Sequence, residues 1–334
     1  MRPLRVGVAG AGYGLRVLAP AFKALPGVRV TAVSASTPES AARAARALGR
    51  VRALVGWRAL AEDPDLDAVV LALPPRHQPA AAALAASRGK AVFLEKPLAL
   101  SLPEARRTAR ALARTPNAIG FEFGELPAYR ALTAHVAAGR LGETRGASVS
   151  WRIASPSLAA ARGWKGTSDS GALRIFTVHA VDMLNRLLGP ARRVACRREF
   201  RPAGADARAL LWLELSGGVS ACVDAVLDAP GGTGWRFAAW GTESSVSWEA
   251  PGGDPCAAVL TAVSPSGARR VLSRPDRRAD TMRHEAAKRL ASKFVRAVNG
   301  GPRCVPGVRE GLAAQAVLEA AARAAKSGRW EAVR

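Results

Sequence analysis

The segment LRVGVAGAGYGLRVLAPAFKAL, residues 4–25, decides the fold of the first part of the chain. Its first six residues form a short apolar run typical of a buried strand, and three glycines then mark a tight turn before a helix-like stretch. Gly10 and Gly12 allow close approach of a pyrophosphate, which the N-terminus of the next helix favours. The third glycine of the G-x-G-x-x-G pattern is displaced, because Leu15 stands at its position and Gly14 comes one residue early.

Strands and helices alternate after this turn. Strands are predicted at 27–33, 66–74 and 91–97, with helices at 38–49 and 78–90 between them. This strict alternation predicts an α/β fold with an N-terminal Rossmann, doubly wound parallel sheet. A dinucleotide then binds at the carboxyl ends of the strands. We expect this cofactor to contact Gly10, Gly12, Tyr13, Gly14 and Pro74.

The residues after the second strand bear on the choice of cofactor. The strand ends in Ser34-Ala35-Ser36-Thr37, where proteins that bind NAD usually carry an Asp or Glu for the ribose hydroxyls. Ala35 cannot do this, whereas the hydroxyls of Ser36 and Thr37, with Arg43 in the next helix, can bind a 2′-phosphate. NADP(H) is therefore the preferred cofactor, with NAD(H) possible. The alternative is that the hydroxyl residues simply cap the helix.

Length and composition indicate two globular domains. The chain has 334 residues, of which 49% are apolar and 22% charged. It contains no run of about 20 uncharged apolar residues that would span a membrane. Its first residues read as a strand and turn better than as a signal peptide, so we expect a cytoplasmic protein. The four cysteines are scattered without metal-ligand spacing, and no metal site is predicted.

The net charge of +23 raises the question of a nucleic-acid partner. The 49 basic residues are dispersed along the chain, and only seven of them are lysine, which is more typical of a codon bias than of a selected patch. No nucleic-acid motif accompanies them. We therefore expect a small acidic or phosphorylated ligand, with neither nucleic acid nor membrane as a partner.

Glu95-Lys96-Pro97 ends the predicted strand 91–97 and so lies at the ligand-binding edge of the sheet. Together with GVAGAGYG (7–14), LPPRHQPA (73–80) and GFEFGELPAYRAL (120–132), it makes the chain resemble the Gfo/Idh/MocA family of nicotinamide-dependent oxidoreductases over essentially its whole length. The resemblance implies a Rossmann domain at 1–122 and a substrate-binding and oligomerisation domain at 123–334.

The same resemblance implies the architecture and the reaction. The second domain is expected to be α/β with an open, mostly antiparallel sheet that supports a homo-oligomer, either a dimer or a tetramer. Members of the family oxidise or reduce a sugar, a polyol or a related compound. The resemblance thus implies hydride transfer to or from a sugar-like or other small polar carbonyl or hydroxyl substrate.

Family residues can be carried over at the strand end. The family's lysine falls on Lys96, whose ammonium would hydrogen-bond the reacting oxygen and help its proton to move. Glu95 and Gln78 are expected beside the cofactor, although the family usually has histidine at position 78 and this chain has His77 next to it. The alternative is that Lys96 is a surface lysine at a strand end.

The second half of the chain has its own pattern. Five alternating runs between glycine- and proline-rich turns predict strands at 147–153, 209–215, 220–227, 235–241 and 256–263. Two amphipathic helices are predicted at 282–300 and 309–328, each ending in glycine. His135 and His284 are expected to be ordinary helix-surface residues.

The segment GALRIFTVHAVD, residues 171–182, holds the second catalytic candidate. In the family a glycine-rich turn precedes an Asp, a His four residues later and another acid three residues after that. Here His179 and Asp182 occupy the last two positions, but Ile175 stands at the first. A residue four positions away shares a helix face with the histidine, so the usual Asp can hold the imidazolium. Isoleucine cannot.

Three interpretations of this change stay open. In the first, His179 and Lys96 share proton transfer in the reduction of a carbonyl or an imine. In the second, another acid serves, either Glu122 or Asp169. In the third, His179 only packs, and the protein is a non-catalytic nucleotide-binding sensor or regulator.

Other departures indicate an altered substrate. The arginine that the family commonly has after Gly-Phe falls on Gly124, which removes a polar anchor. We expect the substrate to contact Glu122, Trp164, Lys165 and Asp182, with Lys165 facing a carboxylate or phosphate.

Overall fold

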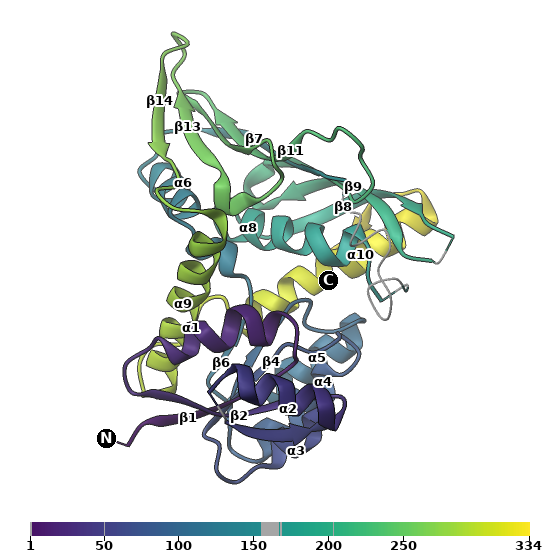
Figure 1. The fold of residues 1–334 in the computed structure, drawn as a ribbon. Helices are drawn as coiled ribbons and strands as arrows, with labels where there is room; N and C mark the ends of the chain where they lie inside the picture. The colour runs from purple at the N-terminus through teal and green to yellow at the C-terminus, as the bar shows by residue number, and fades with distance from the viewer. Residues whose placement is uncertain (1, 50, 155–166, 168, 203) are drawn as a thin grey trace. The chain divides into compact units, whose positions relative to one another are not determined.

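The computed structural model describes residues 2–49, 51–154, 167, 169–202 and 204–334 (Figure 1). The chain forms two compact units. The first comprises Met1–Glu122 with Arg283–Leu312, and the second comprises Phe123–Met282 with Ala313–Arg334. Each unit has its own sheet.

The first unit is built on a six-stranded parallel sheet. Its strands are β1 (Leu4–Ala9), β2 (Val28–Ala35), β3 (Arg52–Val55), β4 (Ala68–Leu71), β5 (Ala91–Leu94) and β6 (Asn117–Ile119). Their order across the sheet is β3-β2-β1-β4-β5-β6, and every pair is parallel. This confirms the predicted doubly wound sheet, with its change of winding direction between β1 and β4.

Helices alternate with these strands. They are the π-helix η1 (Gly14–Leu18), α1 (Ala19–Lys23), α2 (Pro38–Ala47), α3 (Gly56–Glu62), α4 (Gln78–Ser87), α5 (Leu102–Ala111) and α9 (Ala279–Val298), of which the last enters this unit at Arg283. The sequence pattern did not predict β3 or α3. Strand β3 lies at the edge of the sheet with largely exposed side chains, so it carries no run of buried residues to detect.

Residues 283–312 pack with the Rossmann sheet, although the sequence-based division assigned them to the second domain. Phe294 of α9 meets Phe22 of α1 and Phe93 of β5 edge to face, with ring centroids 6.0 and 5.8 Å away, and Phe22 and Phe93 meet in the same way at 5.5 Å. All three rings are fully buried. Burial of rings of this size contributes on the order of 2–3 kcal/mol each, which ties α9 to the sheet.

The second unit is built on a nine-stranded sheet. Its strands are β7 (Thr144–Arg152), β8 (Ala191–Phe200), β9 (Asp206–Leu215), β10 (Ser220–Val226), β11 (Gly234–Gly241), β12 (Ser245–Ala250), β13 (Val259–Val263), β14 (Arg269–Ser273) and β15 (Glu331–Ala332). The order is β14-β13-β12-β11-β7-β10-β9-β8-β15, and only β7 and β10 pair in parallel. The predicted mostly antiparallel sheet is confirmed.

Helical segments of this unit are η2 (Glu122–Glu125), α6 (Pro127–Ala137), the π-helix η4 (Leu173–Thr177), α8 (Val178–Leu188), η5 (Ser216–Gly218), η6 (Pro255–Ala257) and α10 (Val308–Ser327), with η2 and α10 shared with the first unit. In Figure 1, α8 and α10 lie against one face of the sheet. Side chains alternate accordingly along β11, where Trp235 and Phe237 are buried while Arg236 and Trp240 are exposed. One face of this sheet thus presents side chains to solvent.

His135 differs from expectation. It lies on α6 and is buried, with 7% of its surface exposed, and Nε2 lies 3.4 Å from Oγ of Ser244. Burial lowers the pKa of His135, and the charges of Arg140 and Arg270 add to this effect. The expectation of an ordinary surface histidine was wrong, because the hairpin between β11 and β12 covers it.

None of the helices in the described part of the chain combines the length and the apolar character needed to cross a membrane.

Candidate active site

The glycine-rich turn follows β1, where the fold positions a dinucleotide. Gly10 has φ +108°, and a Cβ there would lie 2.3 Å from the carbonyl oxygen of Ala72, so only glycine fits. Gly12 is exposed, and a Cβ on it would meet nothing within 4 Å. Gly14 packs tightly, its Cβ position lying 2.9 Å from the Cβ of Ala72. These residues therefore fit a pyrophosphate beside the turn.

The helix after this turn begins as a π-helix, Gly14–Leu18, which is a form often found at functional sites. Its carbonyl groups need partners outside the regular helical pattern. Nε2 of His284 on α9 donates to the carbonyl oxygen of Arg16 at 2.9 Å. His284 thus ties α9 to the helix that follows the glycine-rich turn, a role that the sequence did not reveal, because 268 residues separate the two partners.

At the carboxyl end of β2, Ser36, Thr37 and Arg43 are all exposed. Thr37 caps α2, since its Oγ1 accepts from the backbone N–H of Ser40 at 3.2 Å while Oγ of Ser40 accepts from Thr37 at 3.2 Å. Glu39 stands in the first turn of α2. Hydrogen bonds from its own backbone and from Thr37 lower the pKa of Glu39, so a carboxylate is present near this end of the strand.

Glu95 and Lys96 directly follow β5, as predicted, and both are partly exposed. The buried side chain of Gln78 holds this turn, because its Nε2 donates to the carbonyl oxygen of Pro97 at 3.0 Å. Within the described residues, Oε1 of Gln78 is buried without a hydrogen-bond partner. Pro74 lies partly exposed in the neighbouring loop after β4.

Two acids and a phenol meet at this edge of the sheet. The hydroxyl of Tyr13 donates to Oε1 of Glu122 at 2.7 Å, and Glu122 is 5% exposed. Burial, followed by the charge of Glu122, raises the pKa of Glu95 to about 8, although the charge of Lys96 and a hydrogen bond from its backbone act in the opposite direction. Burial, followed by the charges of Glu122 and Glu95, raises the pKa of Tyr13 well above its ordinary value.

Gly120 makes room for this cluster. A Cβ on Gly120 would lie 2.4 Å from Oε1 of Glu95, so any side chain there would push the Glu95 carboxyl aside. Among the described residues, this Oε1 is buried without a hydrogen-bond partner. The carboxyl thus lies in a place that disfavours its charge.

The second unit holds His179, which is buried with 4% of its surface exposed. Its ring lies 4.5 Å from the ring of Phe123 and 6.3 Å from that of Trp151, measured between centroids. Trp151 in turn stacks on Phe176 at 4.0 Å. Ile175 is partly exposed in the π-helix before α8. The surroundings of His179 are therefore strongly aromatic, which the sequence pattern did not predict.

A buried aspartate positions the start of this helix. Asp206 is fully buried, and its Oδ2 accepts from the backbone N–H of Leu173 at 2.8 Å, while Oδ1 accepts from Arg198 at 2.8 Å. Gly171, with φ +106°, leaves the space that this carboxylate occupies, since a Cβ there would lie 2.1 Å from Oδ1. The glycine turn before the helix therefore serves packing against Asp206.

Asp182 is engaged by an arginine from the next turn of α8. Arg186 donates to both carboxylate oxygens at 2.6–3.1 Å, and Asp182 is 2% exposed. The guanidinium also lies over the Tyr129 ring, 5.3 Å from its centroid. Gly124 provides its space, since a Cβ there would lie 2.3 Å from Arg186 Nη2. The guanidinium of Arg186 thus lies against position 124, where the family commonly has an arginine of its own.

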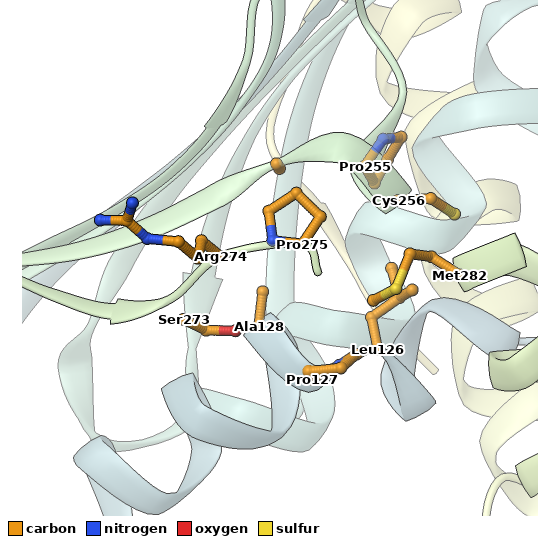
Figure 2. Close-up of a pocket in the computed structure, with 10 residues that line it drawn as sticks. Leu126, Pro127, Ala128, Pro255, Cys256, Ser273, Arg274, Pro275 and Met282 are labelled. Atoms are coloured by element: carbon orange, nitrogen blue, oxygen red, sulfur yellow. The ribbon is translucent and has the colours of Figure 1, made fainter. Parts of the chain in front are cut away.

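Two predicted substrate residues, Trp164 and Lys165, lie outside the described residues, whereas Asp169 is described and partly exposed. Figure 2 shows a pocket of the second unit, lined mainly by apolar side chains such as Leu126, Pro255 and Met282. None of the predicted site residues lines it. It offers few polar groups with which to orient a substrate.

The comparisons with known proteins agree with this architecture. Residues 4–123 match the model of an oxidoreductase family with an NAD-binding Rossmann fold, and residues 129–247 match the Gfo/Idh/MocA C-terminal domain. A dTDP-3,4-didehydro-2,6-dideoxy-alpha-D-glucose 3-reductase from Streptomyces violaceoruber is 34% identical over 254 residues, which cover 74% of this chain and 73% of the relative.

Two further likenesses concern levoglucosan dehydrogenase. The enzyme of Pseudarthrobacter phenanthrenivorans is 29% identical over 228 residues, covering 62% of this chain and 58% of the relative. A solved levoglucosan dehydrogenase in complex with NADH and levoglucosan has the same fold, with a TM-score of 0.88 at 22% identity, covering 99% of this chain and 100% of the other. With its Rossmann sheet, its C-terminal sheet and these matches, the chain belongs to the Gfo/Idh/MocA family of NAD(P)-binding oxidoreductases.

Proposed function

We propose that this protein is an NADP(H)-dependent oxidoreductase that transfers hydride to or from a sugar-like or other small polar carbonyl or hydroxyl compound. The observation that carries the proposal is the position of Lys96. It follows β5 at the carboxyl edge of the parallel sheet, on the same edge as the glycine-rich turn after β1. Ligands of such sheets bind at this edge.

The names of the relatives support a sugar-type substrate. One is a reductase of a dTDP-linked keto sugar and another a dehydrogenase of levoglucosan. When bound, the reduced nicotinamide supplies the hydride. Lys96 polarises the substrate oxygen and gives it a proton, and His179 assists. Glu122, Asp182, Trp164 and Lys165 are proposed to face the substrate. Asp182 is proposed to do so as part of its ion pair with Arg186.

Reduction is the proposed direction. Oxidation of an alcohol needs a base that removes the hydroxyl proton, and Ile175 cannot strengthen His179 in that role. Reduction of a carbonyl needs a proton donor, which the ammonium of Lys96 provides. The reductase among the relatives is consistent with this choice.

Gly10, Gly12, Tyr13 and Gly14 are proposed to bind the pyrophosphate side of the cofactor, and Pro74, Gln78 and Glu95 its nicotinamide side. A preference for NADP(H) is supported by Ala35, which leaves the end of β2 without a carboxylate, and by the exposed side chains of Ser36 and Arg43. Two features oppose it. Thr37 is used as a helix cap, and Glu39 brings a negative charge nearby.

The second unit is proposed to bind the substrate and to form a homo-oligomer, a dimer or a tetramer. The exposed face of its sheet, which includes Trp212 and Trp240, each with more than 40% of its surface exposed, supports this role. Sedimentation analysis of the wild type and of Trp212→Ser/Trp240→Ser tests it. A monomeric wild type would rule the oligomer out.

A second candidate function is a non-catalytic nucleotide-binding sensor, which the isoleucine at position 175 favours. One experiment separates the two functions. The purified protein is mixed with NADPH and a panel of ketoses, keto sugars and nucleotide-linked keto sugars, and oxidation of the cofactor is followed by its absorbance. Turnover with any of them supports the oxidoreductase, whereas tight NADPH binding without turnover across the panel supports the sensor.

A further inference from the structure

The first unit contains a pair of acids, Glu95 and Glu122, that proton transfer by Lys96 alone does not require. Glu95 follows β5 and Glu122 follows β6, which are neighbouring strands, so both carboxyls reach the same edge of the sheet. Tyr13, from the turn after β1, donates a hydrogen bond to Glu122 and not to Glu95. The two acids therefore have different hydrogen-bonding environments.

Glu122 has a hydrogen-bond donor close by. Its Oε1 accepts a hydrogen bond from the Tyr13 hydroxyl at 2.7 Å. Glu95 has the environment of a neutral acid. Its Oε1 packs against Gly120 with no hydrogen-bond partner among the described residues, and the negative charge of Glu122 faces it. Of these two nearby carboxyls, Glu95 is therefore the one whose charged form the surroundings disfavour.

Charged groups act on both Glu95 and Tyr13. Glu122 and Lys96 act on Glu95 with opposite signs, as do Glu122 and Arg283 on Tyr13. Arg283 comes from α9, which packs on this unit. Lys96 is thus a cation whose charge acts on the Glu95 carboxyl, and it is the neighbour of Glu95 in the chain.

We propose that Glu95 and Glu122 share one proton at this edge of the sheet, and that Glu95 returns this proton to Lys96 after each reduction. The inference rests on the proposed function. In the reaction, Lys96 gives a proton to the substrate oxygen as hydride from the reduced cofactor is added to the carbonyl carbon, and the ammonium becomes an amine. The O–H bond of Glu95 then breaks, its proton forms a new N–H bond on Lys96, and the carboxylate takes a proton from water.

This proposal assigns to Glu95 the part of a proton-holding acid, a residue type that is absent at position 175 beside His179. Glu95 acts through Lys96, so it is a positioning and proton-holding residue. The charge of Glu122 raises the pKa of Glu95, and Tyr13 holds the Glu122 carboxyl through its hydrogen bond. The proposal predicts that a substitution of Glu122 changes the pKa of Glu95 while Glu95 itself stays in place.

The first test measures protonation directly and needs no substrate. Infrared spectra of the full chain, with and without NADPH, are recorded across pH to follow the C=O stretch of protonated carboxyls. We expect one carboxyl that is protonated at neutral pH and titrates near pH 8. This signal is lost in Glu95→Gln, and in Glu122→Gln its midpoint falls by about one pH unit or more. Glu62→Gln, a surface acid of α3, is the matched control and leaves it unchanged.

The second test measures turnover against pH with a keto substrate. In Glu95→Gln, kcat falls by about tenfold or more at saturating NADPH, a condition under which a change in cofactor affinity does not contribute. In Glu122→Gln, the basic limb of the kcat profile moves to lower pH together with the infrared midpoint. Tyr13→Phe, which keeps both carboxyls, supplies a second variant and shifts the same limb.

The two tests fail separately. If no carboxyl of the wild type is protonated at neutral pH, or if its signal survives Glu95→Gln, the shared proton is wrong. If the signal behaves as expected but the pH profiles of all three variants match the wild type, the return of the proton to Lys96 is wrong. A protein that shows the infrared signal but turns over no substrate overturns the proposed function while the shared proton stands.

Discussion

The phenol of Tyr13 donates a hydrogen bond of 2.7 Å to the carboxylate of Glu122, which joins the turn after β1 to the loop after β6. This bond crosses the carboxyl edge of the Rossmann sheet between residues that are 109 positions apart. It leaves Glu95, between them at the end of β5, as the acid whose charge the protein disfavours. The stability of the protein should therefore carry a signature of Glu95.

The pKa of Glu95 makes unfolding depend on pH in a definite direction. Its pKa is about 8 in the folded chain against an ordinary 4.5, so the folded state binds the proton more tightly between these values. The free energy of unfolding therefore falls as pH rises from about 4.5 to about 8. Glu95→Gln carries no such charge. We expect it to be more stable than the wild type, by a margin that widens over this range.

Urea unfolding at a series of pH values checks this, with Glu62→Gln as the control. If the free energies of unfolding of the wild type and Glu95→Gln change with pH in parallel from pH 4.5 to pH 8, the charge of Glu95 does not destabilise the folded protein.

Gly124 and Arg186 are expected to be energetically coupled. A Cβ at position 124 would lie 2.3 Å from Arg186 Nη2, and the guanidinium cannot easily move because Asp182 holds it with three hydrogen bonds. We expect Gly124→Ala to lower the free energy of unfolding by about 1–3 kcal/mol. Arg186→Met removes the three hydrogen bonds that the buried Asp182 carboxylate accepts from the guanidinium, and should cost about 3–5 kcal/mol.

A double-mutant cycle measured by chemical denaturation tests the coupling. In the Arg186→Met background the Gly124→Ala penalty should largely disappear, because the clashing group is gone. Additive penalties would mean that Gly124 is required for another reason.

The proposed preference for NADP(H) predicts that the exposed charges of α2 affect the binding of the two cofactors differently. Arg43→Ala should weaken NADPH binding by about tenfold and NADH binding little, because a charge-assisted hydrogen bond to a 2′-phosphate contributes on the order of 1.5–3 kcal/mol. Glu39→Gln should strengthen NADPH binding, since it removes a carboxylate whose pKa is lowered. Arg46→Ala, an exposed arginine of the same helix, is the matched control.

Titration calorimetry with both nucleotides gives these affinities. Equal losses for NADPH and NADH in Arg43→Ala, or NADH bound more tightly than NADPH by the wild type, would contradict the preference.

Position 175 is expected to limit oxidation. An acid there would stabilise the imidazolium that forms when His179 accepts a proton, and so raise its strength as a base. We expect Ile175→Asp to increase the rate of alcohol oxidation with NADP⁺ at neutral pH, while Ile175→Asn, of similar size but uncharged, does not. If the two variants oxidise the alcohol at the same rate, the charge at this position is not what limits the reaction.

The sequence predicted those parts of the molecule that depend on local patterns. The alternation of apolar strands and helices indicated the parallel sheet, the glycine turn indicated the end of β1, and Glu95-Lys96-Pro97 indicated the end of β5. The edge strand β3 was missed because its residues are mostly exposed. The two π-helical segments, η1 and η4, have five residues each, which is too short for an apolar period to distinguish them from the α-helices that follow, so neither was expected as a π-helix.

The remaining features of the site depend on contacts between distant residues. Tyr13 and Glu122 were each candidates, but nothing in the sequence paired them. Arg186 was missed because its role depends on the space at Gly124, some 60 positions earlier. The glycine at 124 was the available signal, since an arginine absent from one position of a family pattern invites a search for another.

The role of Lys96 is the central claim, and one measurement tests it most directly. The single-turnover rate of NADPH oxidation by a keto sugar found in the panel is compared between the wild type, Lys96→Ala and the surface control Lys326→Ala, alongside the Kd of NADPH for each. Lys96→Ala should bind NADPH as the wild type does, react on the order of 10²–10⁴-fold more slowly, and recover part of the rate when a small primary amine is added. Lys326→Ala should react normally. A Lys96→Ala protein that reacts at the wild-type rate would contradict the account.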